Sequence, residues 1–231
     1  MNPITAARIV QPDLLTPAGV YAPQQDSHLL IDTMEVSGLV RGSRVLDLCT
    51  GSGVVAIAAA QMGAGSVTAF DICARAARCS RDNARVAGVD VDIRCASWTC
   101  ALACEPFDLV VSNPPYVPSP PHGGRIPAAA GPESSWNGGV DGRIMLDPLC
   151  HCAATLLRGG GSMLLVQSAL ADVGRSLKAL RDSGLDVEIV ASQWISFGPV
   201  LSARAGWLER TGRIPRGCRE EQLVVIRADK P

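Results

Sequence analysis

The residues Asn113, Pro114, Pro115 and Tyr116 follow one another directly after the apolar run 107–111. Each proline fixes its own φ angle and lacks an N–H group, so the segment offers carbonyl oxygens without competing donors. The carbonyls of Asn113 and Pro114, together with the side-chain oxygen of Asn113, can form a surface that only accepts hydrogen bonds. Such a surface suits a planar NH2 group, as in a carboxamide or an aminated base, because it can hold both hydrogens. The segment therefore indicates chemistry at that nitrogen.

A glycine-rich turn upstream indicates a second binding element. A short strand pattern ends in Asp47, and Gly51 and Gly53 then open a helix rich in Ala, Ile and Val. The glycines let a ligand approach the backbone, and the new helix offers free N–H groups. With Asp71 about 20 residues further on, the spacing also matches the dinucleotide pattern, so nicotinamide binding stays open. Asp47 favours another ligand, since a carboxylate there would repel a pyrophosphate and attract a cationic, phosphate-free nucleoside.

Strand patterns alternate with helix patterns along the chain, which predicts an α/β fold with a mainly parallel sheet covered on both faces. We expect strands at 44–49, 67–71, 91–95, 107–112, 162–167, 185–191 and 222–227, helices at 24–39, 53–62, 73–87, 141–157 and 169–183, and a short helix or hairpin arm at 201–211. Ligands of such sheets bind beyond the carboxyl ends of the strands. Asp47, Asp71, Ser97 and Asn113 all follow strand ends, so we expect them to line one crevice.

Length and composition predict one compact domain. The 231 residues divide into an expected N-terminal arm or lid, 1–22, and a single domain, 23–231. The net charge of −1 and the pI near 6.3 give no broad footprint for nucleic acid, so we do not expect a nucleic-acid partner. No signal-peptide pattern and no membrane-spanning apolar run occur in the sequence. We therefore expect a cytoplasmic protein without a membrane partner.

The nine cysteines do not predict a metal centre. No pair has the C-x-x-C spacing of a zinc site, and the count is odd. We expect reduced thiols and no metal.

The Pro/Gly-rich segment 117–139 is too long for a plain connection, which indicates a functional loop. His122 within it is the histidine nearest the expected active side, but the proposed chemistry needs no histidine.

Four segments together resemble the HemK-type glutamine methyltransferases, a family that modifies peptide-chain release factors. Residues 47–53, Asp-Leu-Cys-Thr-Gly-Ser-Gly, are similar to the first motif of Rossmann-like methyltransferases that use S-adenosylmethionine. Residues 113–116 are similar to the motif of those that methylate nitrogen conjugated to an sp2 system. Residues 136–143, Trp-Asn-Gly-Gly-Val-Asp-Gly-Arg, resemble the motif that follows it in the HemK type, and residues 20–27 resemble its lid segment. The resemblance implies a class I methyltransferase fold, a seven-stranded, mostly parallel sheet with helices on both faces, and S-adenosylmethionine as cofactor.

The resemblance also implies which residues of the turn and the second strand bind the cofactor. Asp71 is expected to accept hydrogen bonds from the ribose hydroxyls, with Ile72 beside the adenine. Thr50, Gly51 and Gly53 are expected to let the ribose and the methionine part lie against the backbone. These five residues would hold the cofactor from its adenine to its methionine part.

Further cofactor contacts are expected from the lid and from the third strand. Asp47 at the first strand end belongs to the cofactor site, and Tyr21 and Ser27 of the lid segment are expected to close over the ligand. Where the family usually has an acidic residue for the adenine amino group, this chain has Ser97, followed by Trp98. Ser97 can still form a hydrogen bond, and Trp98 can stack on or beside the purine.

The catalytic residues implied by the resemblance are Asn113, Pro114, Pro115 and Tyr116, of which Asn113 also borders the cofactor. The oxygen of the Asn113 side chain and the Pro114 carbonyl would hold the two N–H groups, and Tyr116 would form a wall against the planar group. Transfer from a sulfonium requires nitrogen, methyl carbon and sulfur to lie in line. The acceptor dipoles would stabilise the positive charge that develops on nitrogen.

The expected substrate is the glutamine carboxamide of a peptide-chain release factor. The chain resembles the shorter eukaryotic and archaeal branch of the family, without an N-terminal helical domain, whose members work with a small zinc-ribbon activator protein. Three alternatives stay open: methylation of adenine or guanine in nucleic acid, methylation of protein lysine, and a nicotinamide-binding or non-catalytic module.

Overall fold

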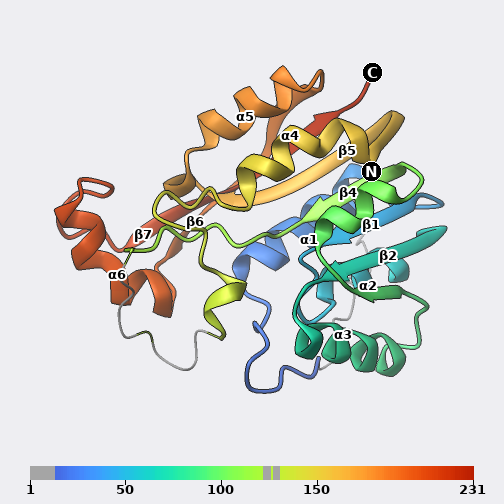
Figure 1. The fold of residues 1–231 in the computed structure, drawn as a ribbon, viewed down its shortest axis with the longest axis horizontal. Helices are drawn as coiled ribbons and strands as arrows, with labels where there is room; N and C mark the ends of the chain where they lie inside the picture. The colour runs from blue at the N-terminus through green and yellow to red at the C-terminus, as the bar shows by residue number, and fades with distance from the viewer. Residues whose placement is uncertain (1–13, 122–125, 127–130) are drawn as a thin grey trace, which may run out of the picture.

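The structure, a computed structural model, describes residues 14–121, 126 and 131–231. Within these residues one seven-stranded sheet has the order β3-β2-β1-β4-β5-β7-β6 (Figure 1). The strands are β1 Arg44–Leu48, β2 Ser66–Asp71, β3 Asp92–Cys95, β4 Phe107–Ser112, β5 Leu157–Ser168, β6 Asp186–Ser196 and β7 Glu220–Asp229. β1 to β5 pair in parallel, and β7 pairs antiparallel with β5 and β6. This arrangement confirms the predicted Rossmann-like methyltransferase fold.

Helices cover both faces of the sheet. α1 Gln25–Ser37, α2 Val54–Gln61 and α3 Ala74–Val86 share one hydrophobic cluster with the sheet, and α4 Leu146–Leu156 and α5 Val173–Asp182 share the other. α6 Pro199–Arg210 lies apart from both layers, at one end of the sheet (Figure 1). Because both faces are covered, β1 and β4 are almost wholly buried, and most of their residues are apolar, as is typical of parallel central strands.

The order of the strands fixes the position of the ligand crevice. The chain runs outward from β1 through β2 to β3 and then returns to β4 on the other side of β1. In open sheets this reversal of order opens a crevice beyond the carboxyl ends of the two central strands. Leu48 and Ser112 pair at those ends, and the Ser112 hydroxyl donates to the Leu48 carbonyl over 2.9 Å. The two motifs of the sequence therefore emerge side by side.

Two predicted elements have different boundaries. β5 begins at Leu157 rather than at residue 162, because the glycines that follow pair with the C-terminus: Gly160 donates to the Lys230 carbonyl, and Lys230 donates to the Gly161 carbonyl. The predicted helix 141–157 begins only at Leu146, since residues 141–145 form turns that orient Arg143.

The C-terminal third differs in three further places. The predicted helix 169–183 is divided, because Asp172 adopts a left-handed φ of 58° between a short 3-10 helix and α5. β6 continues to Ser196 instead of ending at residue 191, with a register shift between Ile189 and Ala191. The segment 201–211 is a helix and not a hairpin arm, and Pro199 occupies its first turn.

Several expectations concern membrane spans, cysteine thiols and metal sites. Among the described helices, none combines the length and the apolar character that crossing a membrane requires. All nine cysteines are free thiols, and the described residues contain no group of three or more His, Cys, Asp or Glu side chains that could hold a metal. Residues 1–13 of the predicted arm and His122 lie outside the described residues.

Candidate active site

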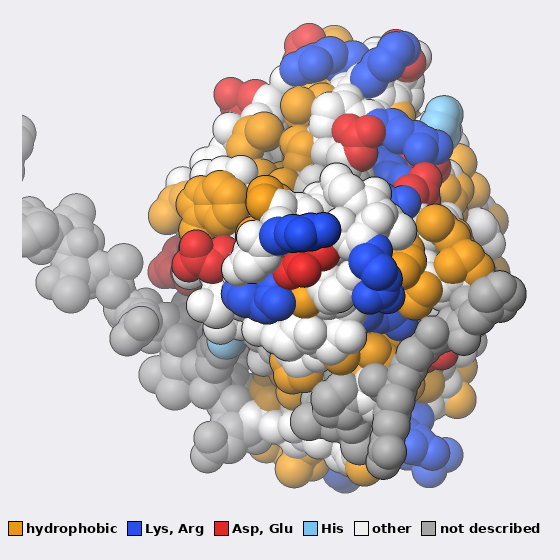
Figure 2. Space-filling view, turned by 90° about the vertical axis from the view of Figure 1, so that its left-hand side faces the viewer, with side chains coloured by type: hydrophobic (Ala, Val, Ile, Leu, Met, Phe, Trp, Pro, Cys, Tyr) orange, Lys and Arg blue, Asp and Glu red, His pale blue; other side chains and the backbone are white. Residues whose placement is uncertain are grey.

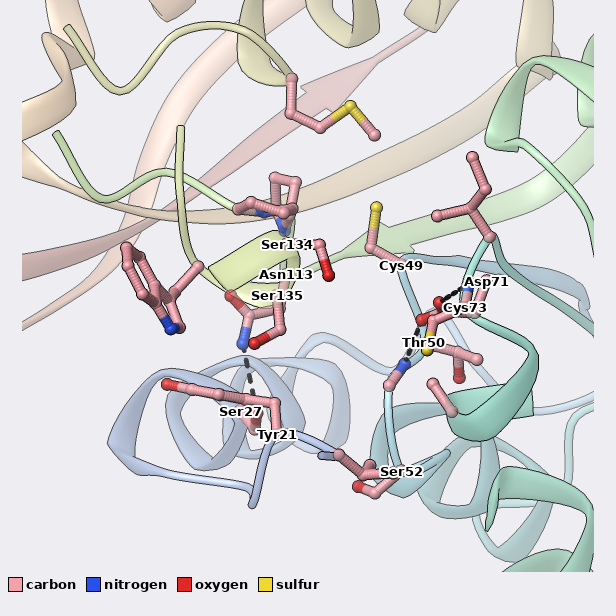
Figure 3. Close-up of a pocket in the computed structure, with 18 of the residues that line it drawn as sticks. Tyr21, Ser27, Cys49, Thr50, Ser52, Asp71, Cys73, Asn113, Ser134 and Ser135 are labelled. Carbon is pink, nitrogen blue, oxygen red and sulfur yellow. Dashed lines mark hydrogen bonds between the residues drawn. The ribbon is translucent and has the colours of Figure 1, made fainter. Parts of the chain in front are cut away.

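A cavity of about 340 Å³ lies beyond the carboxyl ends of β1, β2 and β4. The predicted residues that line it are Tyr21, Ser27, Asp47, Thr50, Gly51, Asp71, Ile72, Ser97, Trp98, Asn113, Pro114, Pro115 and Tyr116. Gly53 is the exception: it does not line the cavity but precedes α2 as its N-cap. Figure 3 shows side chains from the lid segment, the glycine turn, β2 and the segment after β4 facing one space. One crevice thus brings together nearly all residues selected from the sequence.

The glycine turn has the backbone geometry that its sequence predicts. Gly51 and Gly53 have φ angles of 58° and 88°, in the left-handed region that glycine adopts without strain. A side chain at Gly53 would also collide with Ser80 of α3. Cys49 has a φ of 62° although it is not glycine, which marks a strained position at the edge of the cavity. Burial raises the pKa of the Cys49 thiol, so it is a neutral group there.

Two carboxylates at the strand ends form the acidic floor of the cavity. Asp47 is 1% exposed, accepts a 2.6 Å hydrogen bond from the Thr50 hydroxyl, and has its pKa raised to about 7 by burial. Asp71 accepts from the backbone N–H groups of Gly51 and Cys73 over 2.9 and 2.8 Å (Figure 3). Burial raises the pKa of Asp71 as well. Asp71 therefore fixes the glycine turn, while Cys73, not Asp71, is the N-cap of α3.

Residues that follow β2 and β3 form the cavity wall beyond Asp71. Ile72 is 76% exposed although it is apolar, and it borders the cavity. The Ser97 hydroxyl accepts from the Thr99 N–H and caps the short 3-10 helix Trp98–Ala103. Trp98 is half-buried and packs against the hydrophobic core. A flat apolar ligand group could lie between the Ile72 and Trp98 side chains.

Asn113 lies on the opposite side of the cavity, directly after β4. Its side-chain nitrogen donates to the Ser27 hydroxyl over 3.2 Å (Figure 3). This contact fixes the rotation of the amide, because the nitrogen is used by α1 and the oxygen keeps its lone pairs for another partner. Pro114 is buried and Pro115 half-buried, so the segment is held rigidly.

Asp26 connects the lid to this segment, a role that the sequence did not suggest. It accepts hydrogen bonds from the Tyr116 hydroxyl at 3.0 Å, the Tyr21 hydroxyl at 3.3 Å and the Ser27 N–H at 2.7 Å. Asp26 and Ser27 are of residue types that often cap helices, but the N-cap of α1 is Gln24, which has no side-chain cap bond. Burial, followed by the charge of Asp26, raises the pKa of both tyrosines, so both keep their protons as donors.

A second buried acid, Glu221 at the start of β7, lies behind this network. Its side chain is 7% exposed, and one carboxylate oxygen has no hydrogen-bond partner. Burial raises its pKa to about 7, with Ser168 opposing and Asp26 adding to the shift. No local signal distinguishes Glu221, because it is one of two consecutive glutamates and the pairing of β7 decides which of them is buried.

The motif 136–143 forms the rim on the acceptor side. Val117 donates to the Trp136 carbonyl and Gly138 donates to the Val117 carbonyl, so the motif pairs with the chain after Tyr116. Buried Arg143 anchors the other end through the Asp147 carboxylate and the Ala171 carbonyl. The Trp136 ring lines the cavity and carries the Arg204 guanidinium of α6 at 4.8 Å from its centre.

Known proteins with similar sequences are methyltransferases. The family model described as "Methyltransferase small domain" matches residues 12–121. Human methyltransferase HEMK2 is 32% identical over 72% of this chain and 79% of that protein. The release factor glutamine methyltransferase of Deinococcus radiodurans is 34% identical over 66% of this chain. A candidate protein N5-glutamine methyltransferase of Methanocaldococcus jannaschii is 28% identical over 80% of this chain and 91% of that protein.

The match to the bacterial enzymes is partial. The chain spans about half the length of the bacterial release factor glutamine methyltransferases that it matches, with 55% of the Deinococcus protein covered. The solved structure of the E. cuniculi Mtq2–Trm112 complex, responsible for methylation of the eRF1 termination factor, is 22% identical. It aligns with a TM-score of 0.61 over 92% of this chain and 99% of that chain.

A more distant structure shows the fold alone. The T. thermophilus 16S rRNA methyltransferase RsmC, solved with AdoMet and guanosine, has a TM-score of 0.56 at 20% identity, over 91% of this chain and 44% of that chain.

The identity to human HEMK2 over most of both proteins establishes the family. The chain belongs to the HemK-type methyltransferases, which use S-adenosylmethionine as the methyl donor.

Proposed function

We propose that the cavity binds S-adenosylmethionine and that the chain methylates the side-chain nitrogen of a glutamine in a peptide-chain release factor. The donor set of the cavity fits this cofactor. Asp26, Asp47 and Asp71 line it, and no Lys, Arg or His does so among the described residues. The buried Asp47 carboxylate, with its pKa near 7, is stabilised in its charged form by a ligand of net positive charge. A dinucleotide, with its pyrophosphate, has the opposite charge.

Each wall would hold one part of the cofactor. Asp71 keeps free lone pairs beside its two backbone bonds and would accept from the ribose hydroxyls. Ile72 and Trp98 would enclose the adenine, with Ser97 at its polar edge, and Asp47 with Thr50 would face the methionine part. Tyr21, held by Asp26, and Ser27 would close the lid side. Gly53 would act indirectly, by allowing the close packing of the turn on α3.

The methyl acceptor would be held at the Asn113 end. The cofactor supplies a methyl group bonded to a positively charged sulfur. Asn113 Oδ1 and the Pro114 carbonyl would accept the two N–H groups of the carboxamide and direct the nitrogen toward the methyl carbon. Transfer would form the N–C bond with the nitrogen electron pair, the sulfur would keep the electrons of the C–S bond, and one N–H proton would pass to solvent. Pro115 would keep the carbonyls in place, and Tyr116 would form the wall against the planar group.

One observation carries this proposal: the acceptor-only segment and the acidic cofactor floor border one cavity, with Asn113 fixed through Ser27. Neutral amide nitrogen is a poor nucleophile, so catalysis depends on alignment and on dipoles that stabilise the developing positive charge. The relatives named release factor glutamine methyltransferase support glutamine as the acceptor.

The substrate is tested with purified chain, cofactor labelled in its methyl group, and a release factor in two forms. The release factor with an intact Gly-Gly-Gln loop should take up label, and the form in which the glutamine of this loop is replaced by alanine should not. Label on lysine, or transfer to RNA or DNA in preference to the release factor, would replace this substrate by one of the alternatives. Calorimetry with NAD and S-adenosylmethionine tests the ligand separately.

We also propose a small zinc-ribbon protein as a possible activator and the cytoplasm as the location of this activity. β3 is an edge strand of the sheet, and its Asp92, Arg94 and Cys95 side chains are exposed, so a partner strand could pair with it. The relative from E. cuniculi was solved as a complex with Trm112. Activity of the isolated chain equal to that of the chain with a co-expressed zinc-ribbon protein would refute the need for such a partner.

A further inference from the structure

The chain before α1 forms a strap that crosses α3 and reaches the cavity. We define the strap as residues 14–21, which Figure 1 shows in dark blue beside α3. Its last three residues, Gly19, Val20 and Tyr21, line the cavity. The strap has no strand or helix of its own, so its main-chain groups need partners elsewhere.

α3 supplies these partners from one face. Arg75, Cys79 and Asn83 are spaced four residues apart, so their side chains lie in a row along the helix. The Arg75 guanidinium donates to the Ala18 carbonyl over 3.0 Å, and the Cys79 thiol lies 3.0 Å from the Leu15 carbonyl. The row therefore follows the strap from its beginning to the edge of the cavity.

Asn83 makes the most demanding contacts of this row. Its side chain is 1% exposed, and Oδ1 accepts from the Leu15 N–H at 2.8 Å while Nδ2 donates to the Leu15 carbonyl at 3.0 Å. This two-way pairing reproduces the hydrogen bonds that a neighbouring strand would make. Nδ2 also donates to the carbonyl of Ser52 at 2.9 Å, in the turn between the two glycines. Only a carboxamide side chain of this length offers both an acceptor and two donors in such a fixed arrangement.

We infer that Asn83 is a positioning residue for the cofactor: it fixes the strap above the cavity and the glycine turn beside it in one relative position. This inference rests on the proposed cofactor site. Its consequence is that Asn83 controls how tightly the cofactor is retained, while the transfer step at Asn113, on the other side of the cavity, does not depend on it. Without Asn83 the Leu15 and Ser52 main-chain groups lose their common partner at once.

The test is Asn83→Ala, measured by calorimetry with S-adenosylmethionine and by chymotrypsin digestion without any ligand. Chymotrypsin suits the strap because Leu14, Leu15 and Tyr21 are its only cleavable residues. Loss of the three hydrogen bonds from the buried Asn83 side chain to Leu15 and Ser52 should raise the cofactor Kd about tenfold or more and speed cleavage of the strap by a similar factor. At saturating cofactor, kcat should change far less than KM for the cofactor.

Arg75→Ala serves as the milder variant, because Arg75 is exposed and its loss leaves Ser52 and Leu15 bonded. It should raise both the Kd and the cleavage rate about threefold. Arg85→Ala is the matched control on the exposed side of the same helix, and it should change neither. Folding of each variant is confirmed by circular dichroism.

A folded Asn83→Ala variant with wild-type Kd and wild-type cleavage would overturn the inference. So would a fall in kcat as large as the rise in KM, since that result indicates general damage to the site. The Kd and the cleavage rate need no methyl acceptor. A chain that binds the cofactor but does not methylate any release factor would therefore refute the proposed substrate and leave this inference standing.

Discussion

Glu221→Gln should make the protein more stable above neutral pH and reduce the fall in its stability between pH 5 and 8. Glu221 is 7% exposed, and its Oε2 has no partner. Burial raises its pKa from 4.5 to about 7, so above pH 7 the folded chain must keep a poorly solvated charge. Glutamine has the same shape without the charge.

The direction of this pH dependence follows from proton binding at Glu221. Between pH 4.5 and 7 the folded state binds more protons at Glu221 than the unfolded state does, so the free energy of unfolding falls as pH rises through this window. The contribution is fully present below the unfolded pKa and is lost above the folded one. The difference between the two pKa values corresponds to about 3 kcal/mol.

Urea unfolding at pH 5 and pH 8, without cofactor, measures this contribution. The loss of stability between the two pH values should be smaller by about 2.5 kcal/mol in Glu221→Gln than in the wild type, because pH 5 already lies slightly above the unfolded pKa. Glu220→Gln is the matched control, because Glu220 is the exposed neighbour on the same strand, and it should follow the wild type. Asp47 adds the same fall in the free energy of unfolding to all three proteins, so its effect cancels in the comparison. If the free energy of unfolding fell equally between pH 5 and pH 8 in Glu221→Gln and in the wild type, the buried Glu221 charge would not be the cause of the loss.

Asp71→Asn should weaken cofactor binding by about 10- to 100-fold and leave turnover at saturating cofactor less affected, because a charge-assisted acceptor is lost; calorimetry showing wild-type affinity would exclude the ribose role. Gly53→Ala should destabilise the fold more than Gly51→Ala, because both have positive φ but only a side chain at Gly53 meets a serine of α3; equal melting temperatures would contradict this. Ser27→Ala should lower kcat about tenfold by freeing the Asn113 amide to rotate, and an unchanged kcat would show that the amide is oriented otherwise.

The fold was largely predictable because its signals are local. Buried parallel strands show as apolar runs, and Gly51 and Gly53 mark a turn that needs positive φ. The boundaries of β5 and α4 were less predictable, since they depend on partners far away in the chain. β5 begins early only because Gly160 and Gly161 pair with Lys230.

In the site, too, local signals could be predicted and contacts between distant residues could not. Residues that follow strand ends, such as Asp71 and Asn113, were found from the sequence because topology brings strand ends together. Asp26, which lines the cavity, and Asn83 and Glu221, which lie behind its walls, were not selected from the sequence. Asp26 became apparent only through Tyr116, and the other two through contacts with residues more than 50 positions away. No local pattern in the sequence encodes such contacts.

Asn113→Ala tests the proposed acceptor site itself, with single-turnover methyl transfer and cofactor affinity measured on the same preparation. We expect a transfer rate lower by about 100-fold or more, because the acceptor nitrogen loses one of its two positioning bonds and the stabilising dipole. The Kd for S-adenosylmethionine should stay close to that of the wild type, since the acidic floor at Asp47 and Asp71 is intact. A folded variant that transfers methyl groups at the wild-type rate would show that Asn113 does not hold the methyl acceptor.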